Sequence, residues 1–152
     1  MQPKIAFFGQ SRLFAPDQNI NENENVPLPF GYIAPEYHNH GVITDRSDVF
    51  GLGVLMLEIL TGQTLPLDAD ALIIQDNVAL IQENWSNIQP IQQRYGVGNH
   101  AGIFDVMGCI AIAIECLEID QTRRPTLVMI NNMLLAQRPW IGDNLVRDPY
   151  CP

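Results

Sequence analysis

Charged residues are scarce in this sequence, and basic ones most of all. Its 152 residues include 17 Asp and Glu but only 8 Lys and Arg, so 16% of the positions are charged and the net charge is −9. This shortage of cations argues against nucleic acid and anionic membrane surfaces as partners. Because 47% of the residues are hydrophobic, we expect one globular domain that buries a core.

Cysteine is also rare, with three residues. Cys109 and Cys116 are seven positions apart on one expected helix, about 10 Å along its axis, which is too far for a disulfide. Cys151 lies in the tail. Cysteines that form no disulfide fit a reducing compartment, so we expect a cytoplasmic protein. The sequence also has no secretory leader and no apolar run of about 20 residues, the length that spans a bilayer, so we expect no membrane segment.

Clustered metal ligands are missing as well. His38 and His40 flank Asn39, but no cysteine lies near them, and His100 is far along the chain. A zinc site usually takes four ligands, or three in catalytic sites, from such residues. The sequence therefore predicts no metal site, and we interpret the histidine pair as loop residues.

The most apolar segment runs from Val49 to Leu60 and is broken only by Glu58 and two glycines. Apolar side chains around most of its circumference predict a core helix over 45–61 that is buried on several sides. This helix is the element around which we expect the others to pack.

Both ends of the central helix carry capping residues. Thr44 and Asp45 are suited to its beginning, where Asp48 also lies at the positive end of the helix dipole. Gly62 is suited to the left-handed position that ends a helix.

Other helices are expected around this one. Apolar residues after it predict one or two short amphipathic helices, with one ending at Trp85 and a turn at Pro90. The last helices are expected within 103–136, and 138–152 forms a C-terminal tail. The predicted fold class is therefore mainly α, a helical bundle around a buried central helix.

Three motifs carry a resemblance to a known family. Gly31–Tyr37 is Gly-Tyr-Ile-Ala-Pro-Glu-Tyr, Ser47–Gly62 begins with Ser-Asp-Val-Phe, and Cys116–Thr126 contains Arg-Arg-Pro-Thr. In this order they resemble the distal large lobe of eukaryotic protein kinases, most of all plant receptor-like serine/threonine kinases. The resemblance implies a truncated kinase-like domain over 1–137, a partial C-terminal lobe, with an activation segment over 7–37.

The resemblance implies structural roles for five residues. Ala34, Pro35 and Glu36 match the end of the activation segment, where the glutamate has a buried arginine partner. Arg124 matches that arginine, so we expect a buried, bidentate pair with Glu36. Asp48 matches an aspartate that braces the catalytic loop, a loop this sequence does not contain, so we expect it to keep only a capping role.

The family's chemical residues are missing. Phe7, Phe8 and Gly9 match the family's Asp-Phe-Gly, and a phenyl ring at Phe7 offers no oxygen to magnesium in place of the aspartate. The glycine-rich loop, the ATP-binding lysine and the catalytic-loop aspartate are also absent. Intact family members use ATP and Mg²⁺, whereas for this chain we expect no catalytic residues, no cofactor and no phosphoryl transfer.

Three hypotheses about function remain open. The chain is a pseudokinase-like interaction module, which docks on an intact kinase or its substrate through Gly31–Tyr37 or through the helices after Gly62. Alternatively, it is the C-terminal part of a longer kinase that phosphorylates Ser or Thr with ATP, often the cytoplasmic part of a plasma-membrane receptor in this family. Lastly, it is a degenerate gene fragment without function.

Overall fold

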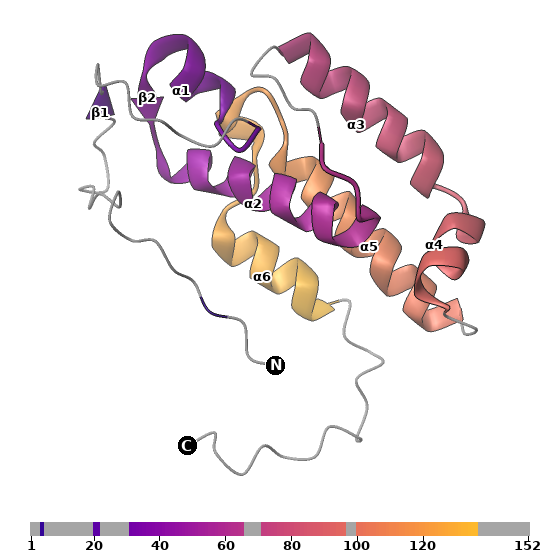
Figure 1. Cartoon of the computed structure of the whole chain (residues 1–152). Helices are drawn as coiled ribbons and strands as arrows, with labels where there is room; N and C mark the ends of the chain where they lie inside the picture. Colours follow the sequence, from indigo (N-terminus) through magenta and orange to yellow (C-terminus); the bar gives the residue numbers. More distant parts are fainter. Residues whose placement is uncertain (1–3, 5–19, 22–30, 66–70, 97–99, 137–152) are drawn as a thin grey trace.

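The computed structural model of the chain is mainly helical (Figure 1), so the expected fold class is confirmed. It describes residue 4 and residues 20–21, 31–65, 71–96 and 100–136. The described elements are, in chain order, β1 (Ile20–Asn21), α1 (Pro35–His40), β2 (Val42–Ile43), α2 (Asp45–Thr61), α3 (Ala71–Trp85), α4 (Ile88–Tyr95), α5 (His100–Cys116), the 3₁₀ helix η2 (Gln121–Arg123) and α6 (Leu127–Ala136).

Several predictions fall on other parts of the chain. Phe7, Phe8 and Gly9, most of the expected activation segment and the tail 138–152 lie outside the described residues. Within the described part, β1 and β2 form an antiparallel pair, with Ile20 opposite Ile43. This pair leads directly into α2.

Helix α2 covers the range expected from the sequence, and its ends are capped by side-chain and glycine geometry. The Thr44 hydroxyl accepts a hydrogen bond from the Arg46 amide at 3.1 Å, and the Ser47 hydroxyl accepts one from the Thr44 amide at 3.1 Å. Together they satisfy amides that have no partner inside the helix. At the other end Gly62 takes a left-handed conformation with φ of 69°, which glycine adopts without strain.

The expectation that α2 is buried on several sides is correct for only part of its circumference. Val49, Phe50 and Leu57 are at most 1% exposed, but Leu55 is 46% exposed and Ile59 is 64% exposed. The reason is that α5 is the main described neighbour of α2, and it packs on the opposite side. An apolar stripe of α2 therefore faces outward.

Close contact between α2 and α5 depends on Gly53. A Cβ atom at this position would lie 2.7 Å from the Cβ of Cys116 and 2.8 Å from the carbonyl oxygen of Ala113. Real Cβ atoms essentially never approach other atoms so closely, so only glycine lets the two helices meet here. The glycine inside the apolar run is thus a packing residue.

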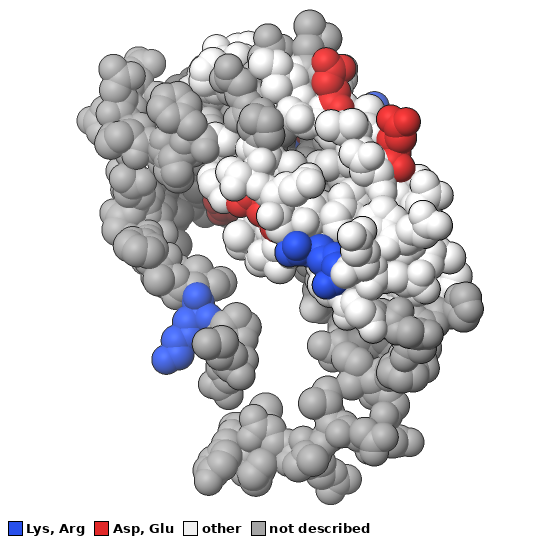
Figure 2. All heavy atoms as spheres, turned by 45° about the vertical axis from the view of Figure 1, so that its right-hand side comes forward, with Lys and Arg blue, Asp and Glu red and all other residues white. Residues whose placement is uncertain are grey.

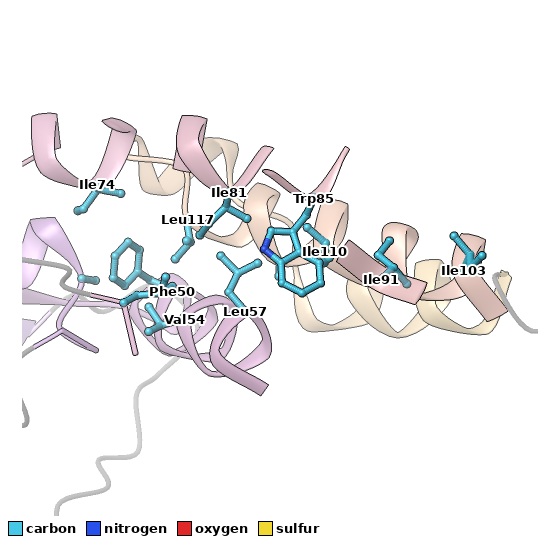
Figure 3. Close-up of a cluster of buried hydrophobic side chains, with 13 residues drawn as sticks. Phe50, Val54, Leu57, Ile74, Ile81, Trp85, Ile91, Ile103, Ile110 and Leu117 are labelled. Carbon is cyan, nitrogen blue, oxygen red and sulfur yellow. The ribbon is translucent and has the colours of Figure 1, made fainter. Parts of the chain in front are cut away.

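The main core lies between α2, α3, α4 and α5. Figure 3 shows Phe50, Val54 and Leu57 of α2 near side chains from the other helices, among them Trp85 of α3. A smaller cluster joins α2 and α5 to α6 through Val49, Ile112, Cys116 and Ile130.

Helix α4 closes the C-terminal end of α2. Tyr95 donates a hydrogen bond to the carbonyl oxygen of Leu60 at 2.6 Å, and Arg94 donates to that of Ile59 at 3.4 Å. The turn expected at Pro90 is wrong, because Pro90 lies inside α4. It occupies the first helical turn, where an amide N–H has no partner within the helix and its absence costs little.

Candidate functional site

A bidentate ion pair joins the beginning of α1 to the loop before α6. Arg124 donates from Nη1 to Oε1 of Glu36 and from Nη2 to Oε2, each at 2.8 Å. The Arg124 side chain is fully buried, and that of Glu36 is 10% exposed. The structure thus brings together two residues 88 positions apart that the resemblance pairs.

Main-chain carbonyls surround the rest of the guanidinium. Nε of Arg124 donates to the oxygen of Glu118 at 2.7 Å, and Nη1 also donates to that of Arg46 at 2.9 Å. The Phe50 ring lies 5.1 Å from the guanidinium carbon, within range of a cation–π interaction. Among the described residues, no buried side-chain nitrogen or oxygen lacks a hydrogen-bond partner. The buried charge is therefore fully compensated.

The Glu36 carboxylate is held in its charged form. Burial alone would raise its pKa, but hydrogen bonds from Arg124, from a backbone amide and from Ser47 outweigh burial and lower the pKa. The Ser47 hydroxyl donates to Oε1 at 2.8 Å. Because Ser47 also caps α2, the cap and the ion pair form one network that joins α1, α2 and the loop before α6.

Ala34 and Pro35 place Glu36 at the start of α1. The Ala34 carbonyl accepts hydrogen bonds from the amides of Tyr37 and His38 at 3.0 and 3.1 Å. Pro35 is buried and occupies the first turn of the helix, where its fixed backbone angle favours helix formation. Glu36 follows directly and points into the network.

Sequence reasoning missed a second link across the same junction. Nη1 of Arg46 donates to the carbonyl oxygen of Arg124 at 2.7 Å, and the Thr44 hydroxyl donates to the side-chain oxygen of Gln121 at 3.0 Å. One signal was available. Arg46 lies in the first turn of α2, where the positive end of the helix dipole disfavours a cation. A contact between its guanidinium and an oxygen of another segment was therefore to be expected.

Asp48 has no part in this network. It is exposed, and within the described part of the chain no hydrogen bond reaches its side chain. The hydrogen bonds that cap α2 come from Thr44 and Ser47, whereas Asp48 lies in the first turn, at the positive end of the helix dipole, as expected. Partial burial of the carboxylate and the charge of Asp45 raise the pKa of Asp48.

A separate contact ties the segment before α1 to the C-terminal half of α2. The hydroxyl of Tyr32 donates a hydrogen bond to Glu58, and this bond raises the pKa of Tyr32. Glu58 also accepts a hydrogen bond from the amide of Leu65 at 3.2 Å. The sequence contained the signal, since Glu58 is the one charged residue between Val49 and Leu60 and such a residue needs a polar partner.

The contacts described above are hydrogen bonds and an ion pair that join segments of the chain. In the described ranges no group of three His, Cys, Asp or Glu side chains could hold a metal ion, and no helix is long and apolar enough to cross a membrane. These contacts hold α1, the beginning of α2 and the loop before α6 together.

Comparison with known proteins places this scaffold in a family. Residues 1–134 match the family model described as protein tyrosine and serine/threonine kinase. The chain is 34% identical over 150 residues to the cysteine-rich receptor-like protein kinase 6 of Oryza sativa subsp. japonica, covering 98% of this chain and 21% of that protein. It is 32% identical over 142 residues to the cysteine-rich receptor-like protein kinase 8 of Arabidopsis thaliana, covering 90% and 20%. The chain thus spans about a fifth of the length of these relatives.

Proposed function

This chain belongs to the protein tyrosine and serine/threonine kinase family, and we propose that its 152 residues act as a protein-binding scaffold that does not itself transfer phosphate. The observation that supports this function is a contrast. The structural pair Glu36–Arg124 is complete and bidentate, whereas Phe7 replaces the magnesium ligand and these 152 residues contain no family catalytic loop.

Phosphoryl transfer depends on positioning and on charge stabilisation by metal ions and cations. A chain without the ligand for magnesium, the lysine for the phosphates and the aspartate for the substrate hydroxyl has no means to supply either. No ATP or Mg²⁺ is therefore expected to bind these 152 residues. The network around Arg124 serves to hold α1 and the segment before it in a fixed position.

The partner proposed for this scaffold is a protein, either an intact kinase or its substrate. One candidate surface is Gly31–Tyr37, where Tyr32 is 37% exposed. The other is formed by the helices after Gly62, where Leu80 of α3 is 54% exposed. Figure 2 shows that the described atoms of the face turned toward the viewer are mostly uncharged. Because the relatives are named as receptor-like kinases, the proposed location is the cytoplasmic side of the membrane.

A second candidate function is supported by the length comparison. Since the chain spans about a fifth of its relatives, the same residues would also fit the distal lobe of a longer serine/threonine kinase that uses ATP. In that case the Glu36–Arg124 network would support a catalytic loop supplied by other residues, and Phe7 would still weaken magnesium binding.

A phosphotransfer assay tests the proposed function. The purified 152-residue chain is incubated with radiolabelled ATP, Mg²⁺ and a general protein substrate, beside the Glu36→Ala variant. We expect no label above the blank in either sample. Label transfer by the wild-type chain that is lost in Glu36→Ala would overturn the proposal, because a contaminating kinase would not respond to that change.

A binding assay tests the scaffold role directly. Isothermal titration of the chain into the kinase domain of the rice relative should release or absorb heat. Tyr32→Ala or Leu80→Lys should weaken the binding, while Leu55→Lys on α2, an exposed position outside both surfaces, serves as the control. Absence of binding to this kinase domain would count against the intact-kinase form of the proposal.

A further inference from the structure

Helix α3 carries an apolar row and an acidic row of side chains on its outward side. Ile73 is 37% exposed and Leu80 is 54% exposed, and Asp76 and Glu83 are exposed as well. The four residues are spaced i, i+3, i+7 and i+10, so they lie on one face of the helix. Figure 1 shows α3 at the edge of the described helices, where a partner can reach this face.

The opposite side of α3 holds the helix in the main core. Ile74 is 1% exposed, Ile81 is 5% exposed and Trp85 is 8% exposed. Because these buried residues fix the position of α3, the outward rows contribute little to the packing of this chain. Their apolar and charged groups are therefore available to a partner.

The two carboxylates of this face have no cation of the chain beside them. Within the described part of the chain, neither Asp76 nor Glu83 forms an ion pair. Helix α3 itself contains no Lys or Arg. The one cation of α4 is Arg94, which donates to the carbonyl oxygen of Ile59 at the end of α2. The outward face of α3 is thus negatively charged without a counter-charge of its own.

We infer that this face of α3 binds a basic amphipathic helix of a partner protein. Apolar residues of that helix cover Ile73 and Leu80, and its Lys or Arg side chains pair with Asp76 and Glu83. Both rows repeat every seven residues, about 10 Å along the axis, and a helix lying alongside α3 presents matching residues at the same spacing. The inference rests on the proposed scaffold function, because it specifies the partner of the surface formed by the helices after Gly62.

Charge complementarity distinguishes this occupant from others. A second copy of the chain has a net charge of −9 and is repelled by the two carboxylates, as is any acidic partner. A basic helix gains from attraction to the carboxylates and from apolar contact with Ile73 and Leu80 together. Opposite charges across an interface also speed association and reject partners of the wrong sign.

A designed peptide tests this inference. The probe is a fluorescein-labelled helical peptide of about 20 residues, with leucines seven apart and lysines beside them, and its control carries glutamate in place of every lysine. Fluorescence anisotropy is measured with the full chain at about 50 mM salt, where screening is weak. The lysine peptide should bind with a dissociation constant below about 100 µM, and the glutamate peptide at least about tenfold more weakly.

Two double variants with the same net charge locate the binding. Asp76→Lys with Glu83→Lys reverses the charge of the face, so it should weaken binding of the lysine peptide at least about tenfold and should bind the glutamate peptide instead. Asp45→Lys with Glu115→Lys makes the same change at exposed positions of α2 and α5 and should leave the dissociation constant within about threefold. Circular dichroism melts verify that the variants fold.

A pair of single variants tests the apolar row. Leu80→Ser should weaken binding of the lysine peptide at least about threefold, whereas Leu55→Ser, at a position of α2 that is 46% exposed, should leave it unchanged. Equal effects of the two double variants, or equal effects of these two single variants, would overturn the inference, because binding would then depend on net charge alone. If the lysine peptide fails to bind while both double variants still bind the kinase domain of the rice relative, the inference is wrong and the scaffold function stands.

Discussion

Replacing Glu36 by alanine is expected to destabilise this chain strongly. The change removes both oxygens that lie 2.8 Å from the nitrogens of a fully buried guanidinium. Loss of one partner from a buried ion pair costs about 3–5 kcal/mol, because the remaining charge is neither paired nor hydrated. For a chain of this length, 1 kcal/mol corresponds to about 2–4 °C. The melting temperature should therefore fall by roughly 6–20 °C.

Arg123 provides a matched control beside Arg124. Its side chain is 70% exposed, and its Nε lies 3.7 Å from a carboxylate oxygen of Glu118. Exposed pairs of this kind contribute about 0–1 kcal/mol. Urea unfolding followed by far-UV circular dichroism should show a much lower midpoint for Glu36→Ala and nearly no change for Arg123→Ala. Equal midpoints for the two variants would refute the conclusion that the buried pair stabilises the fold.

Three further predictions concern pH, packing and thiol reactivity. The stability that the Glu36 carboxylate contributes is present above its ordinary pKa of 4.5 and is lost as pH falls through the lowered folded-state pKa. Acid unfolding of Glu36→Gln should therefore show a shallower loss of stability than wild type, and parallel curves would contradict this. Gly53→Ala places a Cβ 2.7 Å from that of Cys116 and should lower the free energy of unfolding by about 1–3 kcal/mol. Gly51→Ala makes an ordinary 3.4 Å contact and should raise the free energy of unfolding by up to about 1 kcal/mol, and urea unfolding measures both changes. Burial raises the pKa of Cys116 to about 11, so its thiol should react with DTNB only as the chain unfolds, and loss of a fast-reacting thiol in Cys116→Ala would sink this prediction.

The sequence contained enough information to place the central helix. Apolar residues over one continuous run and a capping threonine and glycine at its ends are local signals, and α2 covers Asp45–Thr61 between Thr44 and Gly62. Local signals do not say which neighbours are present. For this reason the outward stripe at Leu55 and Ile59 could not be predicted from the apolar pattern alone.

Of the candidate site, only the ion pair between Glu36 and Arg124 could be predicted from the sequence. Glu36 and Arg124 were paired through the motif resemblance, and the structure places them in contact. The backbone carbonyls around Arg124 and the link from Arg46 depend on how a loop folds, which side-chain patterns do not encode. Asp48 lies in the first turn of α2, as the sequence indicated, but the hydrogen bonds that cap this helix come from Thr44 and Ser47.

The most direct test of the scaffold account is a calorimetric melt of the 152-residue chain with and without Mg–ATP. One cooperative transition is expected, because the core and the Glu36–Arg124 network fold together, and its melting temperature should be the same in both samples. If the chain did bind Mg–ATP, a free nucleotide concentration of about 100 times the dissociation constant would stabilise the folded chain by about 2.7 kcal/mol. If Mg–ATP raised the melting temperature, or if the transition were broad and not cooperative, the chain would not be a folded scaffold that leaves Mg–ATP unbound.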